Sequence, residues 1–206
     1  MIKKYKNVLF GIGIVTLVVG GSELFCRYIL GLGNPPLSIT HPTIEYMFKP
    51  NQDVLRFGNR FITNSYGMRS KQFSQIKKNN ELRILFFGDS VINGGNLTNQ
   101  SDLATEIVQQ KLTESRFNNY QKIIVGNVSA GSWEPSNWLA YVKEYGFFDA
   151  DVIVLLISSH DYADIPTFAQ LNSNTHPTQN PPLATIELCK DIYHSFHWRI
   201  HLTRRI

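Results

Sequence analysis

The sequence predicts a three-layer α/β/α domain built on a short parallel sheet. Apolar runs at residues 83–87, 122–128 and 152–157 have the length and composition of strands, and segments with helical periodicity separate them. Continuous apolar runs are typical of parallel strands that are covered on both faces. Alternating strands and helices with short connections favour right-handed crossovers, which place helices on both sides of the sheet.

The composition agrees with one ordinary domain and an appendage. The chain has 206 residues, of which 43% are hydrophobic and 17% charged, and its aromatic content excludes a disordered protein. The sequence has no internal repeat, which excludes a coiled coil and a collagen. Its two cysteines are too few for a disulfide scaffold. The net charge of +4 is modest and lies partly at the two ends, so it does not indicate nucleic acid as a partner.

The N-terminal segment, residues 1–30, has the pattern of a membrane anchor. Lysines at 3, 4 and 6 precede the uncharged run VLFGIGIVTLVVGG at 8–21. A membrane span needs about 20 apolar residues, so the helix must continue through Glu23 to Phe25 or beyond. We therefore expect an uncleaved signal-anchor helix. The leading lysines predict a cytoplasmic N-terminus and an extracytoplasmic remainder.

Residues 31–81 are expected to form a linker and an extended β-hairpin strap. The sequence GLGNPP at 31–36 ends the helix, and the following segment alternates aromatic residues with Gly and Pro. We expect its Tyr and Phe side chains to form one face of the strap, and Arg56, Arg60 and Arg69 to form the other, polar face. Residues 71–81 are polar and predict a surface helix or loop.

The α/β domain itself is expected over residues 82–206. Helical periodicity predicts helices at 101–115, with Ser101 as N-cap, and at 136–145. Residues 171–182 predict a loop, and 183–202 a final helix.

Small polar residues follow each of the three predicted strands. Ser90 comes after the first strand, Gly131 and Ser132 after the second, and the sequence SSHD at 158–161 after the third. Ligands of such sheets bind at the carboxyl ends of the strands. A serine in this position has the geometry of a nucleophile, and small residues beside it let backbone N–H groups approach an oxyanion.

These strand ends resemble the SGNH (GDSL-type) hydrolases. FFGDSVINGG is similar to the first block of that family, VGNVSAGSW to the second and LLISSHDYAD to the third, while KPNQDVLRFGNRFITNSYGMRS resembles the segment before the first block in membrane-anchored, extracytoplasmic members. The resemblance implies a flavodoxin-like fold with Ser90 as nucleophile. In several such members the reaction is transfer or removal of O-acetyl groups on polysaccharides.

The chain departs from the family in two blocks. Ser158 and His160 replace the Gly and Asn of the third block, and Ser132 stands where many members have Gly, with Gly131 one residue earlier. The expected oxyanion donors are the N–H of Ser90, the N–H of Gly131 or Ser132, and the side chain of His160. His160 is also an alternative base. Asn93 and Trp133 are expected to bind substrate.

The family closes its triad with D-x-x-H, which here matches Asp191 and His194. The resemblance implies that His194 is the base and that Asp191 orients it. The interval from Ser90 to His194 is short, and no fourth or fifth strand is visible after Ile157. The sequence therefore leaves three interpretations of the domain: a minimal member of the family, a truncated member or an inactive one.

The functional expectation is a membrane-anchored serine esterase or acyl transferase. Its substrate would be a small-molecule or polysaccharide ester, with an O-acetyl or short acyl group. The chemistry needs no cofactor, and no metal is expected. The alternative is a catalytically inactive accessory or carbohydrate-binding protein at the membrane.

Overall fold

A computed structural model describes the backbone of residues 2–159 and 165–203, with the side chains of 5–7, 9–159 and 165–193. The chain forms two compact units. The first comprises Met1–Pro35, Arg56–Gly58 and Asn180–Ile206, and the second Pro36–Leu55 and Asn59–Gln179. This division groups the last helix with the first, whereas the sequence suggested one domain over 82–206.

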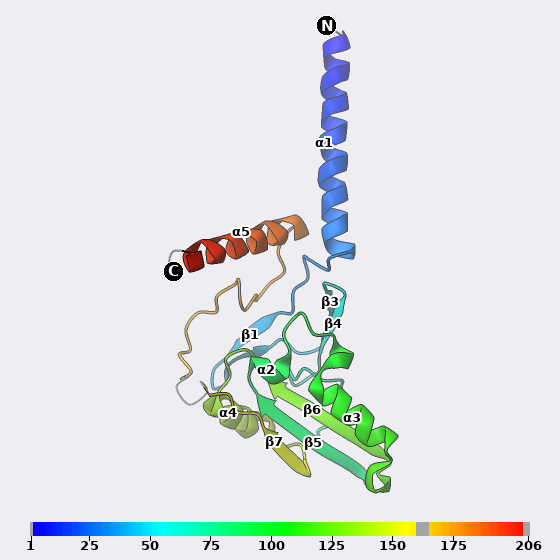
Figure 1. The fold of residues 1–206 in the computed structure, drawn as a ribbon, viewed down its shortest axis with the longest axis vertical. Coiled ribbons are helices and arrows are strands. Elements are labelled where there is room, and N and C mark those ends of the chain that lie inside the picture. Colours follow the sequence, from blue (N-terminus) through cyan, green and yellow to red (C-terminus); the bar gives the residue numbers. More distant parts are fainter. Residues whose placement is uncertain (1, 160–164, 204–206) are drawn as a thin grey trace. The chain divides into compact units, whose positions relative to one another are not determined.

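A three-stranded parallel sheet forms the centre of the second unit (Figure 1). Its strands are β5 (Glu81–Gly88), β6 (Lys122–Ser129) and β7 (Val152–Leu155), in the spatial order β6-β5-β7. Each strand lies on a predicted apolar run, although β7 ends two residues early. The register places Gly88 opposite Ser129, so β5 and β6 end at the same level.

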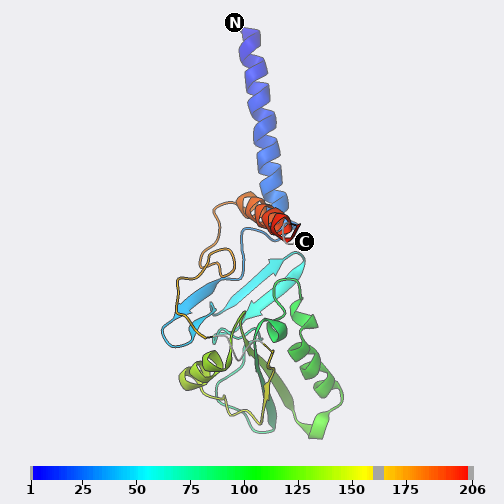
Figure 2. The same ribbon diagram turned by 60° about the vertical axis from the view of Figure 1, so that its left-hand side comes forward.

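One helix covers each face of this sheet, as Figure 2 shows. Helix α3 (Ala104–Glu114) packs Val108 and Leu112 on one face. Helix α4 (Pro135–Tyr145) packs Trp138 and Tyr141 on the other. The alternation along β5 explains this arrangement, because successive strand residues point to opposite faces. Leu82 and Ile84 belong to the α3 side, and Leu85 and Phe87 to the α4 side.

The two helices begin in different ways. Ser101 was expected to cap α3, but it lies within the 3₁₀ helix η1 (Gln100–Asp102), and Leu103 occupies the N-cap. The Ser101 hydroxyl is engaged locally, donating to Asp102 and accepting from Asn99. Helix α4 has a capping box formed by Glu134 and Asn137. A second 3₁₀ helix, η2, spans Phe117–Asn119.

Two β-hairpins stand where one was expected. The first consists of β1 (Ser38–His41) and β2 (Glu45–Phe48), which pair antiparallel. The second consists of β3 (Gln52–Arg56) and β4 (Asn59–Thr63). Residues 71–80 form no helix and lead directly into β5.

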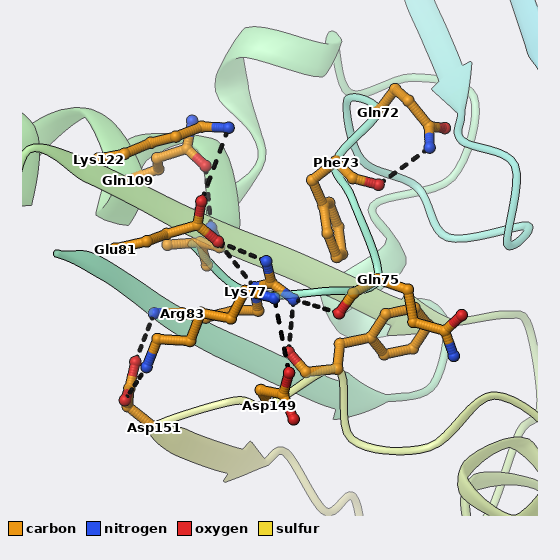
Figure 3. Close-up of polar contacts among 12 residues, drawn as sticks. Gln72, Phe73, Gln75, Lys77, Glu81, Arg83, Gln109, Lys122, Asp149 and Asp151 are labelled. Atoms are coloured by element: carbon orange, nitrogen blue, oxygen red, sulfur yellow. Dashed lines mark hydrogen bonds and ion pairs between the residues drawn. The ribbon is translucent and has the colours of Figure 1, made fainter. Parts of the chain in front are cut away.

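A buried ion pair marks the amino end of β5 (Figure 3). Arg83 is fully buried, and its guanidinium pairs with Glu81 and donates to the carbonyl oxygens of Gln75 (2.9 Å) and Phe148. Because a buried charge is costly without partners, these acceptors make the arginine compatible with an otherwise apolar strand. The cluster lies at the opposite end of β5 from Ser90.

The first unit contains α1 (Ile2–Tyr28) and α5 (Ala184–Thr203). Within α1, Tyr5–Tyr28 has a mean hydropathy of 2.0, and its most apolar window is not buried at all inside the protein. The helix is therefore long and apolar enough to be a membrane anchor or a signal sequence. Helix α5 lies one residue beyond the predicted 183–202.

Candidate active site

Ser90 stands at a tight turn between β5 and the short helix α2 (Ser90–Asn93). Its side chain is exposed, whereas the preceding Asp89 is completely buried and accepts a 2.8 Å hydrogen bond from the N–H of Val91. Gly88 makes the turn possible, because a Cβ at this position would lie 2.7 Å from Cγ2 of Ile92. The turn therefore presents a hydroxyl to solvent on a rigid base.

The end of β7 is tied to this turn by two hydrogen bonds. The hydroxyl of Ser158 donates to Oδ2 of Asp89 at 2.9 Å, and the N–H of Leu156 donates to the carbonyl of Phe87 at 2.8 Å. The first and third predicted blocks are thus joined through their side chains. His160 lies outside the described residues.

The end of β6 is tied to the same turn from the other side. The amide of Asn127 donates to the carbonyl of Ile92 at 2.9 Å, and the amide of Asn93 contacts both the carbonyl and the hydroxyl of Ser129 at 3.3 Å. Asn93 is 3% exposed, so its amide binds protein rather than a substrate, contrary to the expectation from sequence.

Gly131 and Ser132, which the sequence predicts as oxyanion donors, lie just after the end of β6. Gly131 is partly exposed, and Ser132 is exposed with a left-handed backbone conformation (φ 55°). The next residue, Trp133, is 2% exposed and donates its indole N–H to the carbonyl of Tyr46 at 2.9 Å. Trp133 therefore belongs to the core and does not line a cleft, which corrects its predicted role.

Arg69 is a part of this region that the sequence did not indicate. Its fully buried guanidinium donates to the carbonyl oxygens of Gly95 and Thr98, both at 2.6 Å, and to that of Asn93. It also stacks on Phe61 at 4.2 Å. The arginine thus holds the loop that follows α2. Arg69 was expected on the polar face of the strap. The only local sequence feature that agrees with a buried Arg69 is its position after Gly67 and Met68.

A second missed residue is His176, in the loop predicted at 171–182. Its Nε2 lies 4.0 Å from the position that a Cβ on Gly131 would occupy, and its Nδ1 is 2.9 Å from the hydroxyl of Thr175. The ring packs edge-on against Tyr46 with centroids 4.4 Å apart. Burial lowers the pKa of His176, and the charge of Glu45 acts in the opposite direction. The neutral imidazole is therefore favoured near neutral pH.

The predicted acid–base pair lies in the other compact unit. Asp191 is exposed on α5, and His194 lies on the same helix with its side chain outside the described residues. Ser90, Gly131, Ser132 and His176 all belong to the second unit. Among the described side chains, no group of three His, Cys, Asp or Glu is placed to hold a metal ion.

Comparison with protein families, with curated proteins and with solved structures gives no match to this chain.

Proposed function

We propose that the chain is a membrane-anchored serine esterase or acyl transferase of the SGNH type. It would act outside the cytoplasm on acyl esters such as the O-acetyl groups of polysaccharides. The observation that carries the proposal is the exposed Ser90 at a turn that is hydrogen-bonded to the ends of both neighbouring strands. The strand order β6-β5-β7 is also the order of the first three strands of a flavodoxin-like sheet, whose ligands bind at the carboxyl ends of the strands.

In this mechanism Oγ of Ser90 attacks the ester carbonyl and its proton passes to an imidazole. The N–H of Ser90, the N–H of Gly131 or Ser132, and the side chain of His160 stabilise the oxyanion. Collapse breaks the bond to the alcohol, which leaves with the proton from the imidazole, and an acyl ester remains on Ser90. Attack by water then completes hydrolysis, and attack by a sugar hydroxyl completes transfer.

For the base we favour His176 over the His194 implied by the D-x-x-H match. Two features support this choice: His176 lies in the same compact unit as Ser90, and its Nε2 faces Gly131. Ser90 lies two residues beyond Gly88, and Gly131 lies two residues beyond Ser129, which is the partner of Gly88 in the sheet. Because neighbouring strands are about 4.8 Å apart, we expect an imidazole beside Gly131 to be near Ser90 as well. When Nδ1 donates to Thr175, Nε2 carries the lone pair that a general base needs.

The test uses the full chain in detergent, with a fluorophosphonate probe and p-nitrophenyl acetate. Ser90→Ala should abolish labelling and turnover. His176→Gln should slow both by about 10²–10⁴-fold, the usual contribution of a general base, and His194→Gln should leave them near the wild-type level. Ser136→Ala, which removes an exposed hydroxyl on α4, is the matched control.

Each contrary result has a distinct meaning. Labelling that persists in Ser90→Ala removes Ser90 from the mechanism. A wild-type chain that neither labels nor turns over substrate supports the accessory or carbohydrate-binding alternative. Normal rates in His176→Gln, combined with loss in His194→Gln, assign the base to the D-x-x-H pair and leave the function intact.

A further inference from the structure

Helix α5 is fastened to the last turns of α1 by charged side chains. The carboxylate of Glu23 accepts hydrogen bonds from the N–H groups of Ala184 and Thr185, at 2.9 and 3.0 Å. Arg27 donates to the carbonyl of Pro182 at 3.2 Å and pairs with Glu23 at 2.6 Å. The first turn of α5 therefore lies at the level of Glu23 along α1.

This level is close to the boundary of a lipid bilayer if α1 spans one. Residues 7–22 carry no charge and follow the lysine group at 3–6. The hydrocarbon core is about 30 Å thick and takes about 20 helical residues to cross, so a span that begins at residue 7 ends near residue 26. Glu23 and Arg27 then stand at the edge of the core, where polar side chains can reach headgroups and water.

Figures 1 and 2 both show α5 running across the axis of α1 rather than along it. A helix that starts at the bilayer boundary and crosses the axis of the spanning helix extends along the membrane surface. Its two faces then meet different surroundings.

One face of α5 is fixed to the last turn of α1, to the linker that follows α1 and to the β3–β4 turn. Ala184 and Leu188 pack with Cys26 and Leu32, and Glu187 pairs with Arg56 at 2.8 Å. In Figure 1 this linker and the β3–β4 turn lie on one side of α5, and α1 extends from the other side. The fixed face of α5 is thus turned away from the spanning part of α1.

The opposite face of α5 is apolar and uncovered. It is formed by Ile186, Cys189 and Tyr193, which recur at intervals of three and four residues, and by the stem of Lys190. Ile186 is 38% exposed and Tyr193 60% exposed. At 100° per residue these positions lie on the side of the helix opposite Ala184 and Leu188. The uncovered face therefore points toward the bilayer.

We propose that α5 is an interfacial helix that lays the face formed by Ile186, Cys189 and Tyr193 against the lipid surface. An apolar face with an aromatic side chain suits the boundary between headgroups and acyl chains. Lys190 at the border of the face can bury its stem and extend its ammonium group to lipid phosphates. The proposal rests on α1 being a retained anchor and is independent of the catalytic role of Ser90.

The experiment places an environment-sensitive NBD fluorophore on α5 of the full chain, reconstituted in phosphatidylcholine vesicles that contain phosphatidylglycerol. Cys189 is exposed and Cys26 is buried, so Cys26→Ala leaves one reactive thiol on the proposed lipid face. The matched control carries the label at Asp191→Cys, with Cys26→Ala and Cys189→Ala. Position 191 is exposed and lies on the other side of the helix.

The label at 189 should be quenched by lipids that carry a spin label near the headgroup, and its quenching by aqueous iodide should be several-fold weaker than at 191. Equal iodide quenching at the two positions would overturn the proposal. Protection of 189 from iodide without quenching by the spin-labelled lipids would also overturn it, in favour of a protein surface. Extraction of the chain by alkaline carbonate would show that α1 is no anchor, which removes the basis of the proposal.

Discussion

The side chains of Asp89 and Ser158 join the ends of two neighbouring strands through a 2.9 Å hydrogen bond. Asp89 precedes the proposed nucleophile and is completely buried, and Ser158 stands three residues beyond β7. The same carboxylate accepts the N–H of Val91, so one residue holds both the turn at Ser90 and the loop after β7. Positioning of this kind is what a rigid nucleophile turn requires.

Ser158→Ala tests this connection. The variant removes one donor from a buried carboxylate, which should lower the free energy of unfolding by about 1–3 kcal/mol. If the loop after β7 supplies an oxyanion donor, kcat for p-nitrophenyl acetate should also fall, with little change in KM. Urea unfolding in detergent and steady-state kinetics measure the two effects. Ser159→Ala, which removes an exposed hydroxyl from the same loop, is the comparison for stability, and an equal loss there would refute the specific role of Ser158.

Gly88→Ala tests the close approach at the turn. The added Cβ would lie 2.7 Å from Cγ2 of Ile92 and 3.3 Å from the carbonyl oxygen of Leu156. Overpacking of this kind costs about 1–3 kcal/mol, so thermal unfolding should occur at lower temperature. Gly131→Ala is the matched control, because its Cβ meets only Nε2 of His176 at 4.0 Å. Equal stability of Gly88→Ala and Gly131→Ala would contradict the steric argument.

Arg69 should be essential to the order of the loop after α2. Arg69→Met keeps much of the apolar stem but leaves the carbonyl of the buried Asn93 without its donor, which costs about 1–3 kcal/mol, and also frees the partly buried acceptors of Gly95 and Thr98. Arg69→Lys keeps the charge but not the two-pronged geometry, so it should recover only part of the loss. Hydrogen exchange of residues 93–98 and urea unfolding provide the measurements. Arg60→Met, which breaks an exposed pair with Asp53, is the control and should change stability by less than about 1 kcal/mol.

The strands could be predicted because the burial of a strand on both faces leaves a continuous apolar run in the local sequence. The runs at 83–87 and 122–128 are apolar on both faces because α3 and α4 cover both faces of the sheet. The position of Ser90 followed from the same pattern, since a small polar residue after a buried strand emerges at the edge of the sheet. Membrane-spanning potential was also readable, because it depends only on the length and hydropathy of one segment.

The rest depended on contacts between distant residues. Arg69 looked like a surface residue because no local pattern reveals three carbonyl acceptors 24 to 29 residues away. Trp133 and Asn93 stood in the predicted site motifs, yet tertiary packing buries both. His176 lies in a polar loop without periodicity, so only folding brings its ring to Tyr46 and Gly131.

His176 should make stability depend on pH. Burial lowers its pKa in the folded chain, while Glu45 opposes the shift, and an unfolded histidine titrates near about 6.5. Above that pH both states hold a neutral imidazole and the stability is at its full value. As pH falls below about 6.5, the unfolded state takes up a proton first, so the free energy of unfolding decreases until the folded pKa is passed.

His176→Gln should therefore flatten the decrease in stability between about pH 7 and pH 5, because glutamine carries no titrating group. Urea unfolding at several pH values in that interval measures the difference between the variant and the wild type. If His176→Gln keeps the wild-type slope, the burial of His176 does not govern the response. In active protein the acid limb of kcat/KM should fall over the same interval, since protonation of His176 removes the lone pair that accepts the Ser90 proton.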